Sequence, residues 1–289
     1  MIKINKMTRG RFGNKILQYN SLMQLASLIN ESALCVPWQE GNIIFNLPVA
    51  DLDIKARPEK LLTWQDCINR DWNNIKKLHS EFDLILDDPA YILHNVFFHL
   101  THKDPREFFH INNNYKKILP TDKLNIGIHL RGADILGGDR NHGREIHKPE
   151  YYKKSIDLIE SKFDNTKYYV CTDDLNFNSY KDTITYLEYK NCQYGRGDIN
   201  NYFEDFSTLS ECDILIASSS TFVICAGFLG KPYKKIIHSK EWVNKNLNHT
   251  LWHPQGDPPD VRKFQQTFDQ FWIDLYNEDN DFYNVWKWV

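Results

Sequence analysis

Long apolar runs are missing from this chain of 289 residues. None approaches the roughly 18 residues that a membrane-spanning helix needs, so the sequence predicts no such helix. No apolar stretch of signal-peptide type follows the first basic residues, and we expect no signal peptide. A dense block of lysine and arginine is also absent and the net charge is −3, so we expect no binding to nucleic acid.

The six cysteines form no C-x-x-C pair, and most lie inside apolar runs. This pattern predicts reduced core residues in a cytoplasmic protein rather than disulfides or a zinc site. The eleven histidines show no H-E-x-x-H or comparable ligand spacing. We therefore expect no metal and no other cofactor.

The chain does have a regular alternation of short apolar strands with helices. This alternation predicts parallel sheets. A linker expected at residues 120–123 separates two such series, which indicates an α/β fold with two Rossmann-like domains. Strands are expected at residues 1–7, 35–37, 82–86, 124–130, 167–172, 183–187, 213–217 and 235–238, and helices at 15–30, 91–100, 149–163, 200–212 and 222–229, with another helix beginning at 105–109.

Three parts of the chain follow from these expected elements. Residues 1–121 form the first domain, residues 122–250 the second, and residues 251–289 a helical tail. In the tail, aromatic and apolar residues recur at helical spacing over 261–276. We expect this stripe to pack across the two domains, although an aromatic stripe can also contact a membrane surface.

The most informative stretch is I-G-I-H-L-R-G-A-D at residues 126–134. An apolar strand runs into Arg131, which places a guanidinium at the carboxyl end of a strand, where ligands bind in open α/β sheets. The planar donors of arginine suit a phosphate group. A surface salt bridge is the alternative interpretation of this stretch alone.

Two more strand ends of the second domain carry polar groups, namely Asp173-Asp174 and residues 218–221. Ser219, Ser220 and Thr221 precede a helix, and a helix N-terminus with hydroxyl groups favours an anion. Plain N-capping would also explain these hydroxyls. Parallel strands align their carboxyl ends, so the combination with Arg131 favours a diphosphate site. The glycine-bearing loop at 10–14 is either a weaker phosphate signal or a tight turn.

Several motifs, in this order, resemble the GDP-fucose-dependent fucosyltransferase superfamily, and most closely the α-1,2-fucosyltransferases. R-G-R-F-G-N-K-I-L-Q-Y at 9–19 is similar to their G-x-L-G-N-Q-x-F-Q-Y, and residues 128–134 resemble H-I-R-R-G-D. Glu150-Tyr151-Tyr152 resembles a following tyrosine pair, and 169–174 an F-S-D-D strand. Asp205 with 213–222 resembles D-x-x-x-x-S-x-C-x-x-x-I-x-x-S-x-F-S. Gly132 stands where the family has a second arginine, and Val223-Ile224-Cys225 where it has a serine and tryptophans.

The resemblance implies a GT-B fold, two Rossmann-like domains facing each other across a cleft, and inverting transfer of fucose from GDP-fucose to a glycan hydroxyl, in α-1,2 linkage on a galactoside. It implies that Arg131 binds the β-phosphate, that His129 supports its loop, and that Asp205 accepts from guanine. The substrate-binding positions it implies are Arg11, Gly13, Asn14, Asp134, Asp174, Asp205, Ser219, Ser220, Thr221 and Phe222.

Inverting transfer needs a group that takes the proton of the acceptor hydroxyl. Three carboxylates follow Arg131 in the same loop: Asp134, Asp139 and Glu145. Asp134 is better suited to orienting the loop, so Asp139 is the favoured base, unless the transition state is dissociative enough to need none.

Three other functions stay open on the sequence. One is transfer from a different GDP-sugar. Another is a sulfotransferase-like enzyme, for which Lys15 is present but a P-loop context is not. The third is a non-catalytic glycan-binding module. The expected partners are a GDP-sugar donor and an oligosaccharide or glycan acceptor, with peripheral membrane association if that acceptor is linked to a lipid.

Overall fold

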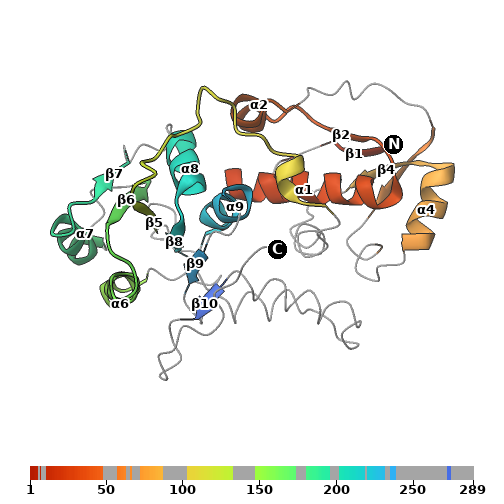
Figure 1. The fold of residues 1–289 in the computed structure, drawn as a ribbon. Helices are drawn as coiled ribbons and strands as arrows, with labels where there is room; N and C mark the ends of the chain where they lie inside the picture. The colour runs from red at the N-terminus through yellow and green to blue at the C-terminus, as the bar shows by residue number, and fades with distance from the viewer. Residues whose placement is uncertain are drawn as a thin grey trace. The chain divides into compact units, whose positions relative to one another are not determined.

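The computed structural model describes residues 1–5, 7, 11–47, 57–62, 66, 72–86, 103–132, 147–173, 180–195, 202–218, 220–231, 235–238 and 272–274. The chain divides into two compact units, Met1–Asn112 and Asn113–Val289. Each unit is built on a parallel sheet (Figure 1). No helix in these described ranges has both the length and the apolar character needed to cross a membrane.

The first unit has a four-stranded parallel sheet in the order β2-β1-β4-β3. Helix α1 packs against β1 and β2 and is buried along most of its length. It ends at Asn30, whose left-handed backbone (φ 58°) lets its N–H bond the last turn. The elements are β1 (Ile2–Ile4), α1 (Phe12–Ile29), β2 (Ala33–Cys35), α2 (Gln39–Phe45), β3 (Glu59–Leu62), α4 (Trp72–Glu81), β4 (Asp83–Leu86) and the 3-10 turn η1 (Pro105–Glu107).

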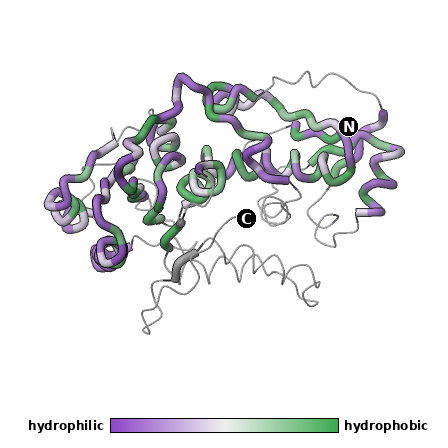
Figure 2. The backbone as a smooth tube through the Cα atoms, viewed as in Figure 1, coloured by the Kyte–Doolittle hydropathy of each residue, from purple (hydrophilic) through white to green (hydrophobic). Residues whose placement is uncertain are grey.

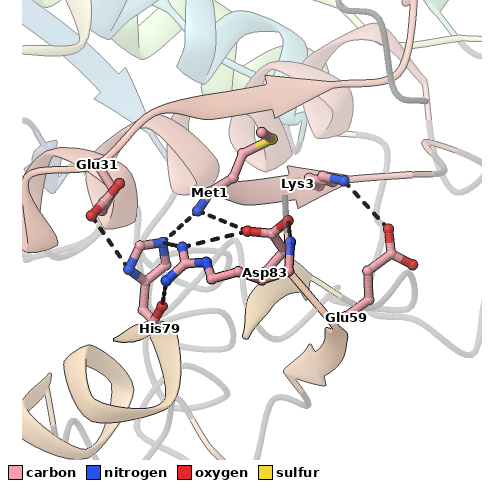
Figure 3. Close-up of polar contacts among 7 residues, drawn as sticks. Met1, Lys3, Glu31, Glu59, His79 and Asp83 are labelled. Atoms are coloured by element: carbon pink, nitrogen blue, oxygen red, sulfur yellow. Dashed lines mark hydrogen bonds and ion pairs between the residues drawn. The ribbon is translucent and has the colours of Figure 1, made fainter. Parts of the chain in front are cut away.

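A polar cluster at the amino edge of this sheet joins β1, α4 and β4 (Figure 3). The Met1 amino group lies 2.5 Å from His79 Nε2 and 3.2 Å from Asp83 Oδ1. Arg57 pairs with the same Asp83 oxygen at 3.4 Å, and His79 Nδ1 lies 3.4 Å from Glu31. Asp83 is fully buried, and the Met1 amino group and Arg57 supply the positive charges that stabilise its carboxylate inside the unit.

The second unit has a six-stranded parallel sheet that runs β7-β6-β5-β8-β9-β10. The first strand of this unit, β5, lies in the middle of the sheet, which is the strand order of dinucleotide-binding folds. The elements are β5 (Leu124–Leu130), α6 (Pro149–Glu160), β6 (Thr166–Thr172), α7 (Lys181–Glu188), β7 (Gln193–Tyr194), α8 (Tyr202–Glu211), β8 (Ile214–Ile216), α9 (Thr221–Leu229), β9 (Lys235–His238) and β10 (Trp272–Asp274).

Alternation along β5 builds three layers. Ile126, Ile128 and Leu130 join the core formed with α6 and α7. His129 points to the opposite face, where its ring stacks on Phe222 of α9. The sheet therefore lies between α6 and α7 on one face and α8 and α9 on the other (Figure 1). Figure 2 shows β8 and β9 in green, as expected for strands covered on both faces.

The predicted α/β class and the parallel sheets are confirmed. Strand β5 has the predicted bounds, and its residues from Asn125 to Leu130 are buried on both faces of the sheet. The strand predicted at 183–187 is wrong, because these residues lie in helix α7. The buried side chains there are Thr183 and Leu187, which are four residues apart and therefore share one face of a helix.

The helix expected over 261–276 is wrong at residues 272–274. These residues form the strand β10, which pairs with β9 in parallel. Tryptophan and isoleucine favour strands, and the β9 edge supplies hydrogen-bond partners. The rest of the tail and the helix expected at 91–100 lie outside the described residues. At 105–109 the chain makes only the 3-10 turn η1.

Residues 120–123, where we expected the linker, belong to the second unit. Asn125 donates from its side-chain amide to the Pro120 carbonyl at 2.8 Å. The Lys117 N–H donates to the Ser207 hydroxyl of α8 at 2.8 Å. These bonds attach the segment before β5 to the second sheet and its helix.

The His79 cluster predicts an acid-sensitive first unit. Burial lowers the pKa of the His79 imidazole below its usual 6.5, the Met1 amino group and Arg57 act the same way, and Glu31 and Asp83 oppose them. The unfolded chain therefore takes up a proton first as the pH falls, so stability is lost from about pH 6.5 down to the lowered native pKa.

We expect His79→Gln, which does not titrate, to remove this slope, which amounts to at most about 1.4 kcal/mol per pH unit. Urea unfolding of both proteins at pH 7.5, 6.5, 5.5 and 5.0 measures it. The control, His110→Gln, changes a histidine outside the cluster. Parallel curves for wild type and His79→Gln would contradict the assignment.

Candidate functional site

The candidate site lies at the carboxyl edge of the second sheet, between β5 and β8. The chain winds away from this point in both directions, because β6 and β7 lie on one side of β5 and β8 to β10 on the other. Ligands of doubly wound sheets bind at such a point. Ile128 pairs with Ile216, so Arg131 after β5 and Ser218 after β8 reach the same edge.

His129 ties the ends of these two strands together. Its Nδ1 lies 2.6 Å from the Ser218 hydroxyl, and its ring stacks on Phe222 with centroids 5.5 Å apart. The imidazole is only 8% exposed. His129 therefore links the end of β5 to the end of β8 and to the first turn of α9.

Arg131 follows β5 directly and is partly exposed. Its carbonyl accepts a hydrogen bond from the Tyr180 hydroxyl at 2.8 Å. The next N–H, that of Gly132, donates to Asp173 Oδ1 at 2.7 Å. Asp173 comes from the end of β6, so the structure brings together three neighbouring strand ends, as the sequence predicted.

The N-terminus of α9 completes this edge. The Ser220 hydroxyl oxygen accepts from the Phe222 N–H at 3.2 Å, so Ser220 is the N-cap of the helix. The hydroxyl hydrogen of an N-cap serine can still be donated to another group. Thr221 is the first helical residue, and the first turn contains no acidic side chain. The positive end of the helix dipole is therefore available for an anion at this edge.

Asp205 lies in the first turn of α8 and packs against Gly195, which follows β7. A Cβ atom at position 195 would lie 2.2 Å from Asp205 Oδ1, so the carboxylate needs a glycine there. Burial raises the pKa of Asp205 to about 7, and the Cys171 thiol and Lys117 oppose that shift. A partly buried carboxylate with a strongly raised pKa is typical of functional sites.

Three predicted residues lie in the first unit. Arg11 is the exposed residue before α1, and Gly13 and Asn14 are buried in its first turn. Asn14 is 7% exposed, a low value for an amide side chain. Five predicted residues lie outside the described part of the chain: Asp134, Asp139, Glu145, Asp174 and Ser219.

In the part of the chain that the structure describes, no group of three or more His, Cys, Asp or Glu side chains could hold a metal ion. The five cysteines within it are free thiols, and four of them are buried.

Sequence reasoning missed three residues of this edge. Tyr180 precedes α7, and no sequence motif marks it. Asp173 was noticed as a strand end, but only its neighbour Asp174 was assigned to the site. Gly195 belongs to none of the motifs, and its fit against Asp205 appears only in three dimensions.

Known proteins resemble this chain over most of its length. The family model described as "Glycosyl transferase family 11" matches residues 2–250. Galactoside alpha-(1,2)-fucosyltransferase 1 of Rattus norvegicus is 22% identical over 290 residues, covering 86% of this chain and 74% of that protein. The protein of the same name from Mus musculus is 22% identical over 291 residues, with the same coverage.

A solved structure of an arginine-to-lysine mutant of Arabidopsis thaliana FUT1 in complex with GDP has a similar fold. It aligns with a TM-score of 0.51 and 16% identity, over 81% of this chain and 69% of that one. The predicted fold class and the resemblance to fucosyltransferases are thus confirmed. The motifs, the strand order and the family match together show that this chain belongs to glycosyl transferase family 11.

Proposed function

We propose that this protein transfers L-fucose from GDP-fucose to a hydroxyl of a galactoside glycan, in α-1,2 linkage and with inversion, without a metal ion. The observation that carries the proposal is the edge formed by Arg131, Ser220 and the α9 N-terminus at the winding point of the second sheet. The two rodent relatives named above are galactoside α-1,2-fucosyltransferases, which supports this choice of donor and acceptor.

Departure of GDP is the step that this edge assists. Negative charge grows on the diphosphate as the bond to fucose breaks, and contacts that strengthen with that charge lower the barrier. Arg131 supplies a fixed positive charge, while the first turn of α9 supplies N–H groups and a helix dipole. Thr221 and Ser219 add hydroxyl groups next to Ser220 in the sequence. Together these groups take the part that a metal ion plays in other nucleotide-sugar enzymes.

Guanine recognition falls to Asp205. A carboxylate accepts from the N1 and N2 donors of guanine, a pair that adenine lacks. Gly195 lets the carboxylate lie against the backbone after β7. Since burial raises the pKa of Asp205 to about 7, a bound guanine would supply the hydrogen bonds that favour the charged form.

Acceptor binding is proposed for the start of α1 in the first unit. Arg11, Gly13 and Asn14 follow β1 and begin α1, so they belong to the carboxyl edge of the first sheet. Asp139 stays our choice of base, with Asp134 and Asp174 as further polar contacts to substrate. The base removes the proton of the attacking hydroxyl while GDP leaves from the opposite face of the sugar.

We expect fucosyl transfer that persists in excess EDTA. Purified protein is incubated with GDP-fucose and a terminal galactoside, and the product linkage is determined by NMR. GDP-mannose with the same acceptor is the control for donor choice. A complete loss of transfer in EDTA that Mg²⁺ or Mn²⁺ restores would contradict the metal-free proposal. Turnover of GDP-mannose but not of GDP-fucose would contradict the choice of sugar.

We expect GDP affinity to fall as the pH drops below about 7, because Asp205 then takes up a proton and stops accepting from guanine. Asp205→Asn should lose this pH dependence and bind GDP about 1.5–3 kcal/mol more weakly. The folded chain holds the proton of Asp205 more tightly than the unfolded chain does. The protonated carboxyl group therefore stabilises the folded chain at low pH, and this stabilisation is lost as the pH rises through about 7.

Asp205→Asn should therefore be at least as stable as the wild type at pH 8. Calorimetric titration of GDP and ADP at pH 6, 7 and 8, with melting curves on the same samples, tests both statements. Glu211→Gln, at the other end of α8, is the matched control. An unchanged preference for GDP over ADP in Asp205→Asn would contradict the assignment of Asp205 to guanine recognition.

We expect Arg131→Ala to lower kcat by about 10²–10³-fold, the scale seen when one preorganised electrostatic donor is removed. Arg131→Lys should also be slow, because lysine keeps the charge but not the planar fork. Lys231→Ala removes a cation from the opposite edge of the sheet, beside Asp213, and serves as the control. A normal kcat with a lowered Tm in Arg131→Ala would show a structural salt bridge instead.

A further inference from the structure

One peptide group at the candidate site is held at both of its polar atoms by side chains. It is the group between Arg131 and Gly132. Its carbonyl oxygen accepts from the Tyr180 hydroxyl at 2.8 Å, and its N–H donates to Asp173 Oδ1 at 2.7 Å. The carbonyl and the N–H of a trans peptide point in opposite directions, so the two side chains hold the group from opposite sides.

The residue at position 132 is glycine, which makes the backbone at this peptide group easy to rotate. Glycine adopts positive and negative φ with similar ease, so a peptide group next to it can rotate at little cost. Such a rotation would change the two backbone angles on either side of the peptide group, ψ of Arg131 and φ of Gly132. It would also break both hydrogen bonds at once, because it exchanges the positions of the oxygen and the N–H. The two side chains therefore restore the rigidity that Gly132 removes.

Tyr180 is itself firmly placed. It is 1% exposed, and its ring meets Tyr152 edge-on with centroids 6.2 Å apart. Tyr152 is fully buried and meets Tyr151 edge-on at 5.0 Å. The Tyr151 hydroxyl lies 2.8 Å from the Ala217 carbonyl, just after β8. A row of three tyrosines thus connects the end of β5 with the end of β8.

Asp173 is placed by the sheet. Leu130 pairs with Thr172, so the residues that follow them lie beside each other at the carboxyl edge. A carboxylate makes a stronger acceptor for the Gly132 N–H than a neutral group would.

We infer that Tyr180 and Asp173 are positioning residues that fix the Arg131–Gly132 peptide so that the guanidinium faces the donor diphosphate. This inference rests on the proposed function, in which Arg131 stabilises the departing GDP. Neither residue touches the reacting atoms. Each acts through Arg131, so the effect of changing either residue should depend on whether Arg131 is present.

A double-mutant cycle tests the route. Tyr180→Phe removes only the hydroxyl and keeps the ring packing, and we expect kcat to fall about 10-fold, because a small misplacement of a catalytic group is costly. In an Arg131→Ala background the same change should have no further effect on kcat, because the group being positioned is gone. Tyr168→Phe is the matched control, since it removes a partly buried hydroxyl that donates to Glu160 near the amino edge.

Asp173 gives a second, independent comparison. Asp173→Ala should lower kcat about 10-fold, while Asp173→Asn, whose amide oxygen can still accept from Gly132, should recover most of it. Amide hydrogen exchange of Gly132 needs no activity. We expect its rate to rise at least 10-fold in Asp173→Ala and to stay near the wild-type rate in Asp173→Asn.

The outcomes separate the inference from the proposed function. Additive losses of kcat in the cycle, or normal kcat with a lowered Tm in Tyr180→Phe, would overturn the positioning role. If the wild-type protein does not turn over GDP-fucose, the proposed function fails. The same cycle measured on the GDP Kd then decides the inference: non-additive losses support it, and additive or absent losses overturn it.

Discussion

Pairing of β5 with a parallel strand on each side is the constraint on which the site depends. β6 and β8 hold its backbone from both directions, so the residues that follow the three strands are brought to one level. That register brings Arg131, Asp173 and Ser218 close together, and hydrogen bonds such as those of Asp173 to Gly132 and of Ser218 to His129 then hold the strand ends. A strand that paired on one side only could shift its end without moving the others. The sheet therefore sets the positions of the strand ends on which the side chains of the candidate donor site then act.

The parts of the fold that could be predicted are those whose burial follows a simple period. β5 alternates apolar residues, and its bounds were predicted correctly. The region of α7 was misread because Ile184 and Tyr186 imitate the alternation of a strand, whereas the buried pair Thr183 and Leu187 follows the helix. Local patterns of such short elements fit both periods, and only contacts with the sheet distinguish them.

The site divides in the same way. Arg131, Asp205 and Ser220 are predicted for the candidate site from the sequence, because each belongs to a motif at a strand end or at the start of a helix. Tyr180 and Gly195 could not, since their roles depend on atoms far away in the chain. Tyr180 acts on the Arg131 carbonyl, and Gly195 makes room for Asp205. Residues that act on a site through distant parts of the chain form no motif that the sequence alone could reveal.

The contact between His129 and Ser218 also bears on how the chain folds. The two residues are 89 positions apart, whereas β5 and β6 are joined by a single crossover. Closing the longer loop costs more chain entropy, and pairings between distant segments form slowly. We therefore expect β5 and β6 to associate early and β8 with α9 to join them late. A partly synthesised or partly folded chain would then contain Arg131 but not the helix N-terminus beside it, so nucleotide binding would mark the completed molecule.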